Sequence, residues 1–365
     1  MKKLRIAQIA PLVESVPPKK YGGTERVVYY LTEGLVEKGH DVTLFASGDS
    51  KTSARLVAPV SQSLRLGRKT RSPIIMNMMT LALVYEEMAG QFDIIHSHLD
   101  FHTLPYAARS STPTVLTMHG RLDTPDYPLI LNQYHDTSYV SISDSQRIPA
   151  PNINWAGTVY HGYPEELFSY NADPEDYFLY LGRFSEEKRP DQAIMLAKAC
   201  NIHLKIAAKI DPADKEYFKN RIEPLLDSPL IEYIGEVGDE KKGELLRNAR
   251  ALLNTIDWPE PFGLVMIEAM ACGTPVIVRR CGSSPEIITD GLNGFICDSK
   301  QDFISAIRNV DRISRLACRQ EFEKRFTLRH MTDNYESLYY KIMADSALRR
   351  PIERRVMEKG AEIAA

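Results

Sequence analysis

Residues 251–278 have the sequence ALLNTIDWPEPFGLVMIEAMACGTPVIV, which predicts one complete strand–helix–strand unit. The runs 251–255 and 274–278 are apolar and resemble short buried strands, whereas 261–270 has the composition of a helix. The prolines before the helix disfavour helical backbone at the residues that precede them. Pro261 suits the start of a helix, where its missing N–H costs little, so we expect the helix to open there. Two strands joined through a helix form a parallel pair.

The same alternation extends in both directions along the chain. Further strand-like runs, separated by helical stretches, lie at 4–10, 41–46, 92–98, 114–118, 177–181, 203–208 and 231–234. Strands that alternate with helices predict an α/β protein with parallel sheets. Residues 164–176 hold two prolines, several acids and few aliphatic side chains, which indicates a linker between two domains.

We therefore predict three parts of the chain. Residues 1–165 form an N-terminal Rossmann-like domain and residues 166–345 form a second one. The charged tail is helical, and we expect residues 346–365 to form a C-terminal helix that packs back on the body of the protein.

The bulk composition narrows the functional class. The chain has 365 residues and a formal net charge of −3, so no overall basic field favours nucleic acid as a partner. No apolar run is long enough to cross a membrane, and the N-terminus lacks the apolar segment of a signal peptide. Five cysteines without C-x-x-C spacing indicate neither a zinc site nor a disulfide framework, so we expect a cytoplasmic protein.

Two carboxylates flank the helix predicted after residue 260. Glu260 lies just before it and Glu268 lies one to two turns inside it. Gly263 allows a ligand to approach the backbone, and the free N–H groups of a helix start favour an anion. Because carboxylates repel an anion, Glu260 and Glu268 are expected to accept hydrogen bonds from hydroxyl groups.

The spacing of Glu260 and Glu268 within EPFGLVMIEAMACGTPVI resembles the E-x7-E signature of retaining family 4 glycosyltransferases, which have two Rossmann-like domains (GT-B type). The similarity covers nearly the whole chain, including the Gly22–Gly23 loop, His119–Gly120 and the segment GRFSEEKRPD at 182–191. It implies two Rossmann-like domains that face each other across a cleft, with a C-terminal helix crossing back to the N-terminal domain.

The resemblance also implies roles for individual residues around this helix. Glu268 is expected to bind the ribose hydroxyls of a nucleotide-sugar donor, and Glu260 the hydroxyls of the transferred sugar. The backbone N–H groups that would meet the sugar and the diphosphate belong to Phe262, Gly263 and Leu264. The alternative, two ordinary acids beside a surface helix, is disfavoured by the surrounding motifs.

Two cations follow the strand that ends at Gly182. Departure of a diphosphate leaving group builds negative charge, which a forked Arg and a point-charge Lys can stabilise. Family 4 enzymes carry an Arg and a Lys at these places for this purpose, so the resemblance assigns the role to Arg183 and Lys188. We interpret the remaining charges of this segment as solvated.

Three more cleft positions follow from strand ends and from the resemblance. His119 directly follows a predicted strand, where ligands bind in open α/β sheets, and the family places a His against the donor sugar there. Gly22 and Gly23 precede a helix and would lie near donor phosphate or acceptor, although they do not form a G-x-G-x-x-G motif. Val237 ends a strand at the place where the family cradles the base.

The sequence favours chemistry without a metal cofactor. No Asp-x-Asp pair occurs, and such a pair holds the divalent ion in the metal-dependent glycosyltransferases of the other major fold. His96, His98 and His102 have no supporting ligand pattern, so a metal site there is disfavoured. These histidines end a strand and could instead line the acceptor side.

Two features leave alternatives open. Arg65, Arg68, Lys69 and Arg71 precede an apolar helical stretch. We favour a solvated loop, with peripheral contact to the inner face of a membrane as the alternative. Tyr163 stands where family members usually have a small aliphatic residue, which departs from the pattern and affects the cleft wall.

We therefore expect a retaining, metal-independent glycosyltransferase that uses a front-face displacement. It would transfer a hexose from a UDP- or GDP-sugar to a hydroxyl of a glycan, a lipid-linked acceptor or a small molecule. Two alternatives on the same fold are a nucleotide-sugar epimerase or hydrolase and a non-catalytic sugar-nucleotide-binding subunit.

Overall fold

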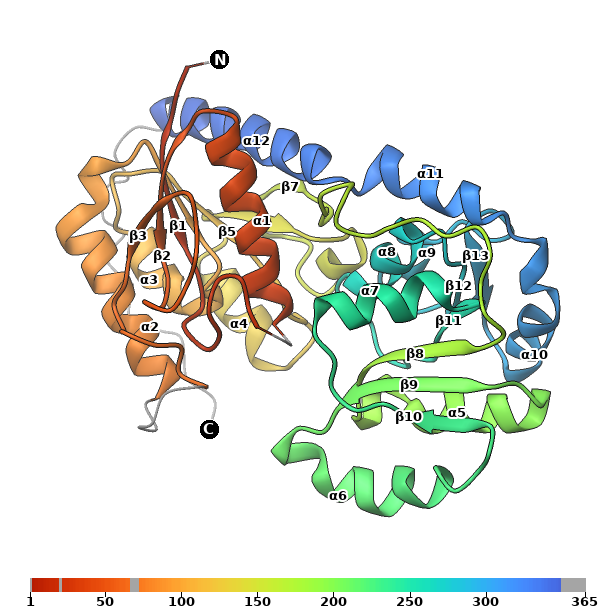
Figure 1. Ribbon diagram of the computed structural model, residues 1–365. Coiled ribbons are helices and arrows are strands. Elements are labelled where there is room, and N and C mark those ends of the chain that lie inside the picture. The colour runs from red at the N-terminus through yellow and green to blue at the C-terminus, as the bar shows by residue number, and fades with distance from the viewer. Residues whose placement is uncertain (1, 20–21, 66–71, 349–365) are drawn as a thin grey trace.

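The computed structural model describes residues 2–19, 22–65 and 72–348. Figure 1 shows two lobes, one built from the first part of the chain and the other from the second. Each lobe contains one sheet with helices packed against it, and the long helix near the end of the chain runs from the second lobe back across the first.

All of the strands in the described residues pair in parallel. Their bounds are β1 Arg5–Ile9, β2 Asp41–Phe45, β3 Arg55–Val57, β4 Ile94–Ser97, β5 Thr114–Thr117, β6 Ser138–Ser141, β7 Trp155–Thr158, β8 Phe178–Arg183, β9 Leu204–Lys209, β10 Ile231–Tyr233, β11 Ala251–Asn254, β12 Val276–Arg279 and β13 Gly294–Cys297.

The α-helices alternate with these strands, as the sequence predicts. Their bounds are α1 Gly23–Glu37, α2 Pro73–Ala82, α3 Leu104–Ala107, α4 Asp126–Gln133, α5 Pro190–Cys200, α6 Lys215–Tyr217, α7 Asp239–Asn248, α8 Leu264–Ala271, α9 Ser284–Ile287, α10 Lys300–Asn309, α11 Arg315–Arg325 and α12 Leu328–Leu348.

The strand order determines where a ligand can bind. The first sheet has the order β3-β2-β1-β4-β5-β6-β7, and the second has the order β10-β9-β8-β11-β12-β13. In each sheet the direction of winding reverses beside the first strand, between β1 and β4 and between β8 and β11. Open α/β sheets bind ligands outside the carboxyl ends of the strands at such a switch point. This order confirms two Rossmann-like domains.

The chain crosses between the two sheets twice, and the two crossings lie against each other. Tyr163, on the first crossing, donates its N–H to the carbonyl of Phe326 at 3.0 Å, and the N–H of Leu328 returns a bond to the carbonyl of Tyr163 at 2.7 Å. Helix α12 then packs on α1 and β7 of the first lobe. Its Tyr335 and Tyr339 are fully buried there, which joins the end of the chain to the N-terminal sheet.

Two predicted boundaries differ from the structure. The helix expected from Pro261 begins at Leu264, because Gly263 before it has a φ of 84°, which is incompatible with a right-handed helix. The helix that returns to the first lobe is α12, which begins well before the predicted range 346–365. Residues 349–365 lie outside the described part of the chain.

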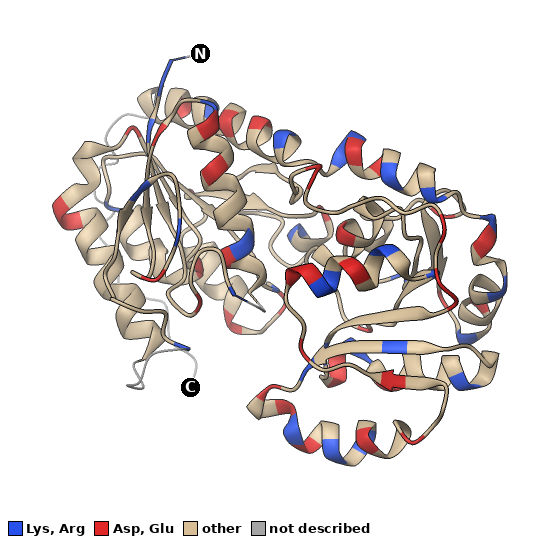
Figure 2. Ribbon diagram, viewed as in Figure 1, with Lys and Arg blue, Asp and Glu red and all other residues tan. Residues whose placement is uncertain are grey.

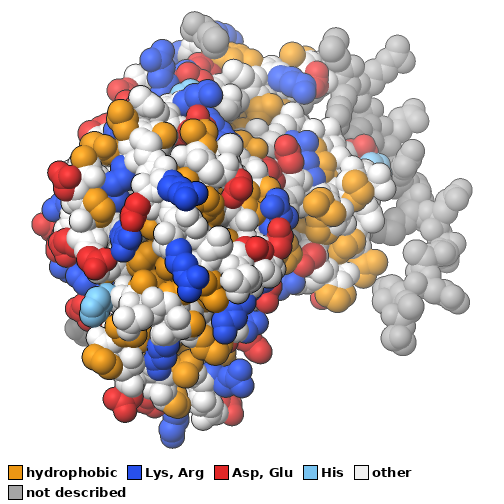
Figure 3. Space-filling view, turned by 90° about the vertical axis from the view of Figure 1, so that its right-hand side faces the viewer, with side chains coloured by type: hydrophobic (Ala, Val, Ile, Leu, Met, Phe, Trp, Pro, Cys, Tyr) orange, Lys and Arg blue, Asp and Glu red, His pale blue; other side chains and the backbone are white. Residues whose placement is uncertain are grey.

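Charged side chains are spread over both lobes. Figure 2 shows basic and acidic residues intermixed on the helices of the second lobe, whereas α2 of the first lobe contains no charged residue. On the face shown in Figure 3, basic and acidic side chains again alternate. No broad area of one charge sign covers that face.

Gly162 tests how closely the two crossings pack. A Cβ atom built at this glycine would lie against the carbonyl group of Thr327 on the second crossing, and backbone cannot rotate out of the way. We expect Gly162→Ala to lower the free energy of unfolding by about 1–3 kcal/mol through overpacking. Thermal unfolding measures this, with Gly120→Ala as the control, since a Cβ at Gly120 meets nothing within 4 Å. Equal stability of the two variants would contradict close packing of the crossings.

Candidate active site

A large cavity lies between the two sheets. It has a volume of about 690 Å³ and is lined by the carboxyl ends of strands from both lobes, by the start of α1 and by the start of α8. The cavity brings together every site residue predicted from the sequence, namely Gly22, Gly23, His119, Arg183, Lys188, Val237, Glu260, Phe262, Gly263, Leu264 and Glu268.

The start of α8 forms one wall of this cavity. Gly263 caps the helix in a left-handed conformation, and a Cβ atom there would lie 2.7 Å from the Met266 side chain. The N–H groups of Leu264 and Val265 belong to the first turn, where the helix itself offers no carbonyl partner. Both residues line the cavity, so the positive end of the helix dipole faces it.

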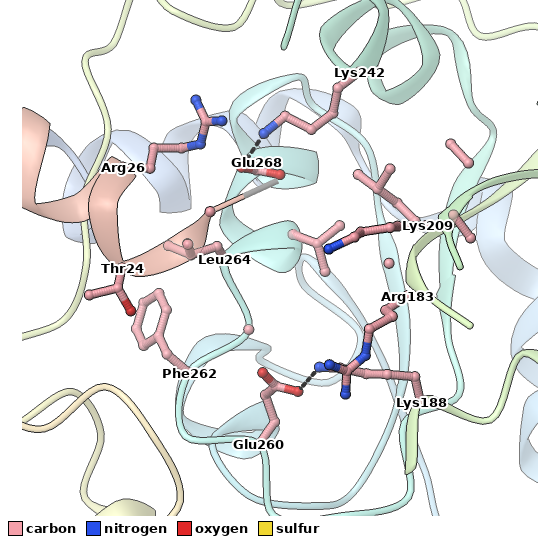
Figure 4. Close-up of a pocket in the computed structure, with 18 of the residues that line it drawn as sticks. Thr24, Arg26, Arg183, Lys188, Lys209, Lys242, Glu260, Phe262, Leu264 and Glu268 are labelled. Atoms are coloured by element: carbon pink, nitrogen blue, oxygen red, sulfur yellow. Dashed lines mark hydrogen bonds and ion pairs between the residues drawn. The ribbon is translucent and has the colours of Figure 1, made fainter. Parts of the chain in front are cut away.

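Lys188 and Glu260 form an ion pair at one end of the cavity (Figure 4). The Lys188 ammonium also lies 5.3 Å from the ring centre of Trp258. The ion pair places Lys188, which was predicted to stabilise the leaving group, next to Glu260, which was predicted to bind the transferred sugar. Sequence spacing does not reveal this contact, because the two residues come from different strand–helix units.

Arg183 lies beside Lys188 and is held by three acids. Its guanidinium is 2.5 Å from Glu187, 3.5 Å from Asp211 and 3.4 Å from Asp214. These contacts orient the side chain while leaving it about one-third exposed. An anionic ligand could replace part of this carboxylate shell, because a diphosphate offers the same charge-assisted hydrogen bonds.

Lys209 is another cation that lines the cavity, and the sequence interpretation missed it. It is the last residue of β9 and lies in register with Arg183, the last residue of β8. Its ammonium lies 2.5 Å from Asp211. Its position at the end of a predicted strand could have identified it from the sequence, because the ends of neighbouring parallel strands lie at the same edge of the sheet.

Glu268 lies at the opposite end of the cavity and is held by two donors. The Tyr163 hydroxyl donates to Oε1 at 2.7 Å. The Lys242 ammonium lies 2.6 Å from the same oxygen, a contact that Figure 4 shows as a dashed line. The departure from the family pattern at Tyr163 therefore has a structural consequence, because its hydroxyl orients the Glu268 carboxylate. Arg26 of α1 lines the cavity nearby and forms an ion pair with Asp239 of α7, which connects the two lobes.

His119 lies on the N-terminal side of the cavity. Its ring stacks on His161, with 5.5 Å between the ring centres and 18° between the planes, and Phe262 packs edge-on against His161. His161 also lines the cavity, and the sequence interpretation missed it because it lies in an irregular segment, three residues beyond the end of β7.

The expectation that His96 and His98 line the acceptor side is wrong. Both rings are buried beneath the cavity wall, at 0% and 4% exposed. Burial lowers the pKa of each ring well below its usual value, and it lowers the pKa of His119 to about 3, so these rings are neutral at physiological pH.

The loop before α1 faces the start of α8. Gly22 precedes α1 and packs on Pro18, since a Cβ at Gly22 would lie 2.7 Å from the proline ring. Glu25 of the first turn and Glu14 also line the cavity. Arg65 forms an ion pair with Glu14, so it belongs to the cavity rim, whereas Arg68, Lys69 and Arg71 lie outside the described residues.

The arrangement separates the charges along the cavity. Cations and a helix N-terminus gather where a diphosphate would be stabilised, and a carboxylate lies at each end where hydroxyl groups would be accepted. The two lobes contribute opposite walls. This geometry suits a ligand that carries hydroxyl groups on both sides of an anionic centre.

Comparison with known families supports this interpretation. A family model described as "Glycosyl transferases group 1" matches residues 163–326, and a model described as "Glycosyltransferase Family 4" matches residues 21–150. The chain belongs to this glycosyltransferase family. The two matches together take in most of both lobes, so the glycosyltransferase assignment applies to the whole cavity and not to one wall.

Named relatives of this glycosyltransferase share moderate sequence identity with it. An uncharacterised glycosyltransferase of Methanocaldococcus jannaschii is 27% identical, over 64% of this chain and 71% of the relative. A phosphatidyl-myo-inositol mannosyltransferase of Mycobacterium leprae is 24% identical, over 80% of this chain and 83% of the relative.

Solved structures confirm the GT-B fold. Sucrose-phosphate synthase of Thermosynechococcus elongatus has a TM-score of 0.75 at 18% identity, covering 94% of this chain and all of that one. HepE of Anabaena, in complex with UDP and glucose, has a TM-score of 0.71 at 16% identity, covering 93% and 100%. At such identities the likeness establishes the fold alone.

The buried Glu25 makes the stability of this enzyme depend on pH. Burial, with a smaller contribution from Glu14, raises the pKa of its carboxyl from 4.5 to about 7. Between these values the folded protein binds the extra proton, so the free energy of unfolding falls as the pH rises through this range. We expect Glu25→Gln to be more stable than the wild type by up to about 3 kcal/mol near pH 8, with little difference near pH 5.

Thermal unfolding of both proteins at the two pH values checks this expectation. Glu37→Gln is the matched control, because Glu37 lies on the same helix and is exposed. A stability difference that is the same at both pH values would show that Glu25 does not retain a proton.

Proposed function

We propose that this glycosyltransferase transfers a hexose from a nucleotide diphosphate sugar, a UDP- or GDP-sugar, to a hydroxyl acceptor with retention of anomeric configuration. The observation that carries the proposal is the cavity that joins Glu260, Glu268, Arg183 and Lys188 with the start of α8. Each group has a part of such a donor to bind, and the HepE structure was determined with UDP and glucose.

The donor would lie along the cavity with its ribose at Glu268 and its base near Val237. Tyr163 and Lys242 occupy Oε1 of Glu268, which fixes the carboxylate plane and leaves Oε2 to accept a ribose hydroxyl. The diphosphate would then lie between the amides of α8 and the cations at the ends of β8 and β9. The sugar would lie between Glu260 and His119.

In the reaction the acceptor hydroxyl would attack from the face on which the diphosphate leaves. The leaving phosphate oxygen would accept the hydroxyl proton, while Arg183, Lys188 and the helix dipole stabilise the developing charge. No nucleophile is assigned to the protein, so the proposal contains no covalent intermediate. Contact between the lobes, as in the Arg26–Asp239 pair, would help to exclude water from the donor.

The two other candidate activities predict different uses of the same site. A nucleotide-sugar epimerase or hydrolase needs no acceptor, and a non-catalytic subunit would bind the donor without turning it over. The presence of Arg183, Lys188, Glu260, Glu268 and His119 together in one cavity favours an active enzyme over a non-catalytic subunit, and the product formed with an acceptor distinguishes transfer from hydrolysis.

Turnover of a donor panel tests the proposal. From a panel of UDP-, GDP- and ADP-sugars we expect a UDP- or GDP-sugar to release nucleoside diphosphate, measured in the absence of added metal. Lys188→Met should lower kcat by about 10²–10³-fold, as loss of a charge-stabilising group does. Glu268→Gln should weaken donor binding by about 10–100-fold, through loss of hydrogen bonds to a charged group.

Two exposed residues of α7 provide controls of the same type, Glu240→Gln and Lys241→Met, and both should behave as wild type. Binding without turnover would favour the non-catalytic subunit, and release without any acceptor product would favour a hydrolase. Absence of binding across the panel would reject the donor assignment.

Retention and independence from a metal cofactor have their own measurements. The anomeric configuration of the product, read by proton NMR, should match that of the donor. Prior treatment with a chelator should leave the rate unchanged, because Arg183, Lys188 and Lys209 supply positive charge at the leaving group. An inverted product or a rate restored only by a divalent ion would contradict these parts of the proposal.

One surface of the first lobe favours a lipid-linked acceptor. Ile74, Ile75, Met78 and Met79 on α2 are 56%, 56%, 49% and 61% exposed, and they form one apolar helix face. Within the described residues no helix has the length and apolarity needed to cross a bilayer, so contact with a membrane would be peripheral. One relative is named a phosphatidyl-myo-inositol mannosyltransferase. We therefore propose that α2 rests on the membrane that carries the acceptor.

Co-sedimentation with vesicles of anionic phospholipid tests this surface. The double variant Ile75→Asp, Met79→Asp places charge on the apolar face and should weaken vesicle binding by at least about tenfold. Leu316→Asp is the control, since Leu316 is 52% exposed on the other lobe. Equal binding of wild type and double variant would exclude α2 as the membrane contact.

A further inference from the structure

A chain of buried polar side chains runs from His119 into the N-terminal sheet. His119 Nε2 lies 2.8 Å from Nδ1 of His98, and His98 Nε2 lies 2.9 Å from Oε1 of Gln8. Gln8 and His98 are 0% and 4% exposed, so water does not compete for these bonds. The chain connects a cavity residue to β1, an inner strand of the first sheet.

The bonds of Gln8 determine which nitrogen of each ring carries the proton. A neutral imidazole donates from one nitrogen and accepts at the other. The Gln8 oxygen can only accept, so His98 must donate from Nε2 and accept at Nδ1. His119 must then donate from Nε2 to His98, which leaves Nδ1 of His119 as an acceptor.

The orientation of the Gln8 amide follows from its other neighbours. Its Nε2 donates one N–H to the Tyr339 hydroxyl at 3.0 Å, and the second N–H makes a longer contact of 3.4 Å with Nδ1 of His96, which also accepts from Tyr339. The reversed amide would direct two N–H groups at the single acceptor His98 and leave one buried N–H without a partner. Unpaired buried donors cost free energy, which selects the first orientation.

The remaining bonds are consistent with this orientation. The Tyr339 hydroxyl lies 2.7 Å from Nδ1 of His96 and, having accepted from Gln8, donates to it. His96 Nε2 then donates to Thr117 at 2.7 Å, and the Thr117 hydroxyl lies 2.9 Å from Tyr335. Each buried ring nitrogen of His96 and His98 has a partner of the opposite type.

The ring of His119 is also held in place from the other side. His161 stacks on it at 5.5 Å, and Phe262 packs against His161 at 4.8 Å. With Nε2 bound to His98, Nδ1 is the ring nitrogen of His119 that remains for a ligand of the cavity.

We propose that Gln8 and His98 are positioning residues that hold His119 in the Nε2–H tautomer, so that its Nδ1 accepts a hydrogen bond from a hydroxyl of the transferred sugar. The inference rests on the proposed function, because it concerns the sugar end of the donor. It adds a specificity rule: the sugar must present a hydroxyl hydrogen to His119. It also couples the cavity to α12, since Tyr339 of that helix sets the Gln8 amide.

Nitrogen NMR of histidine-labelled protein reads the tautomer directly, without substrate. His119→Gln identifies the His119 signals by their loss. In the wild type we expect the proton on Nε2 of His119. In Gln8→Met, which keeps the chain length and removes the amide, and in Tyr339→Phe, which frees the amide to turn, we expect a mixture of tautomers.

A functional readout separates positioning from folding. Gln8→Met should lower kcat with the active donor by about tenfold while the Kd for the free nucleoside diphosphate stays within twofold of wild type, since the proposed pose places the sugar and not the nucleotide at His119. His102→Gln is the control from the same segment, because His102 bonds to the carbonyl of Leu99 and does not line the cavity.

The outcomes distinguish this inference from the proposed function. A proton on Nδ1 of His119 in the wild type, or an unchanged single tautomer in both Gln8→Met and Tyr339→Phe, would overturn the inference whatever the enzyme transfers. If Gln8→Met does not fold, the wild-type tautomer and Tyr339→Phe still decide the matter. Failure of every donor to bind would reject the proposed function and leave the tautomer result standing.

Discussion

The pairing of the two chain crossings determines how the rest of the molecule is assembled. Tyr163 exchanges backbone hydrogen bonds with Phe326 and Leu328, so the segment that leaves the first sheet and the segment that returns to it are in direct contact. Gly162 has no room for a side chain beside them. Because both sheets are attached to this junction, their carboxyl edges meet across one cavity. Tyr163 also donates its hydroxyl to Glu268, so the junction and the site share a residue.

The parallel arrangement of the strands places several cations together at the carboxyl edge of the second sheet. Arg183 and Lys209 are the last residues of adjacent strands and lie in register. Lys188 follows Arg183 along the chain and ends a single helical turn. Each of these cations has a carboxylate partner, through Asp211, Glu187 or Glu260. Paired charges keep the folded cavity close to neutral, and a diphosphate can exchange with the carboxylates at little net cost in desolvation. The same contacts hold the cations in the geometry that a leaving group requires.

The N-terminal wall depends on neutral groups in place of charges. His96, His98 and Gln8 form a buried network, and burial lowers the pKa values of the two histidines, so these rings are neutral. The direction of the hydrogen bonds, and not charge, therefore determines the orientation of the ring that reaches the cavity. Tyr335 and Tyr339 of α12 complete this network from the far end of the chain. The returning helix therefore acts on the site as well as covering the sheet, which explains why polar hydroxyls are buried in its packing face.

The sequence by itself determined the fold class and the main features of the site. The alternation of strands and helices sufficed because it follows from local periodicity. The sequence also placed Glu260 and Glu268 at the start of one predicted helix, and the resemblance to family 4 glycosyltransferases supplied their expected roles. Strand ends located Arg183 and His119 for the same local reason. Even here local reasoning placed the start of α8 at Pro261, because composition does not reveal the left-handed conformation of Gly263, after which the helix begins at Leu264.

Only the tertiary structure decided which distant residues act together. Three residues illustrate this: Lys242 lies on a helix surface, Arg26 lies across the cleft, and His161 lies in an irregular segment. Nothing in the local sequence of these residues distinguishes them from ordinary surface or core residues. The direction of the hydrogen bonds from Gln8 through His98 to His119 is likewise invisible in the sequence. It depends on three strands and a helix meeting at one point, and such contacts join residues up to 331 positions apart.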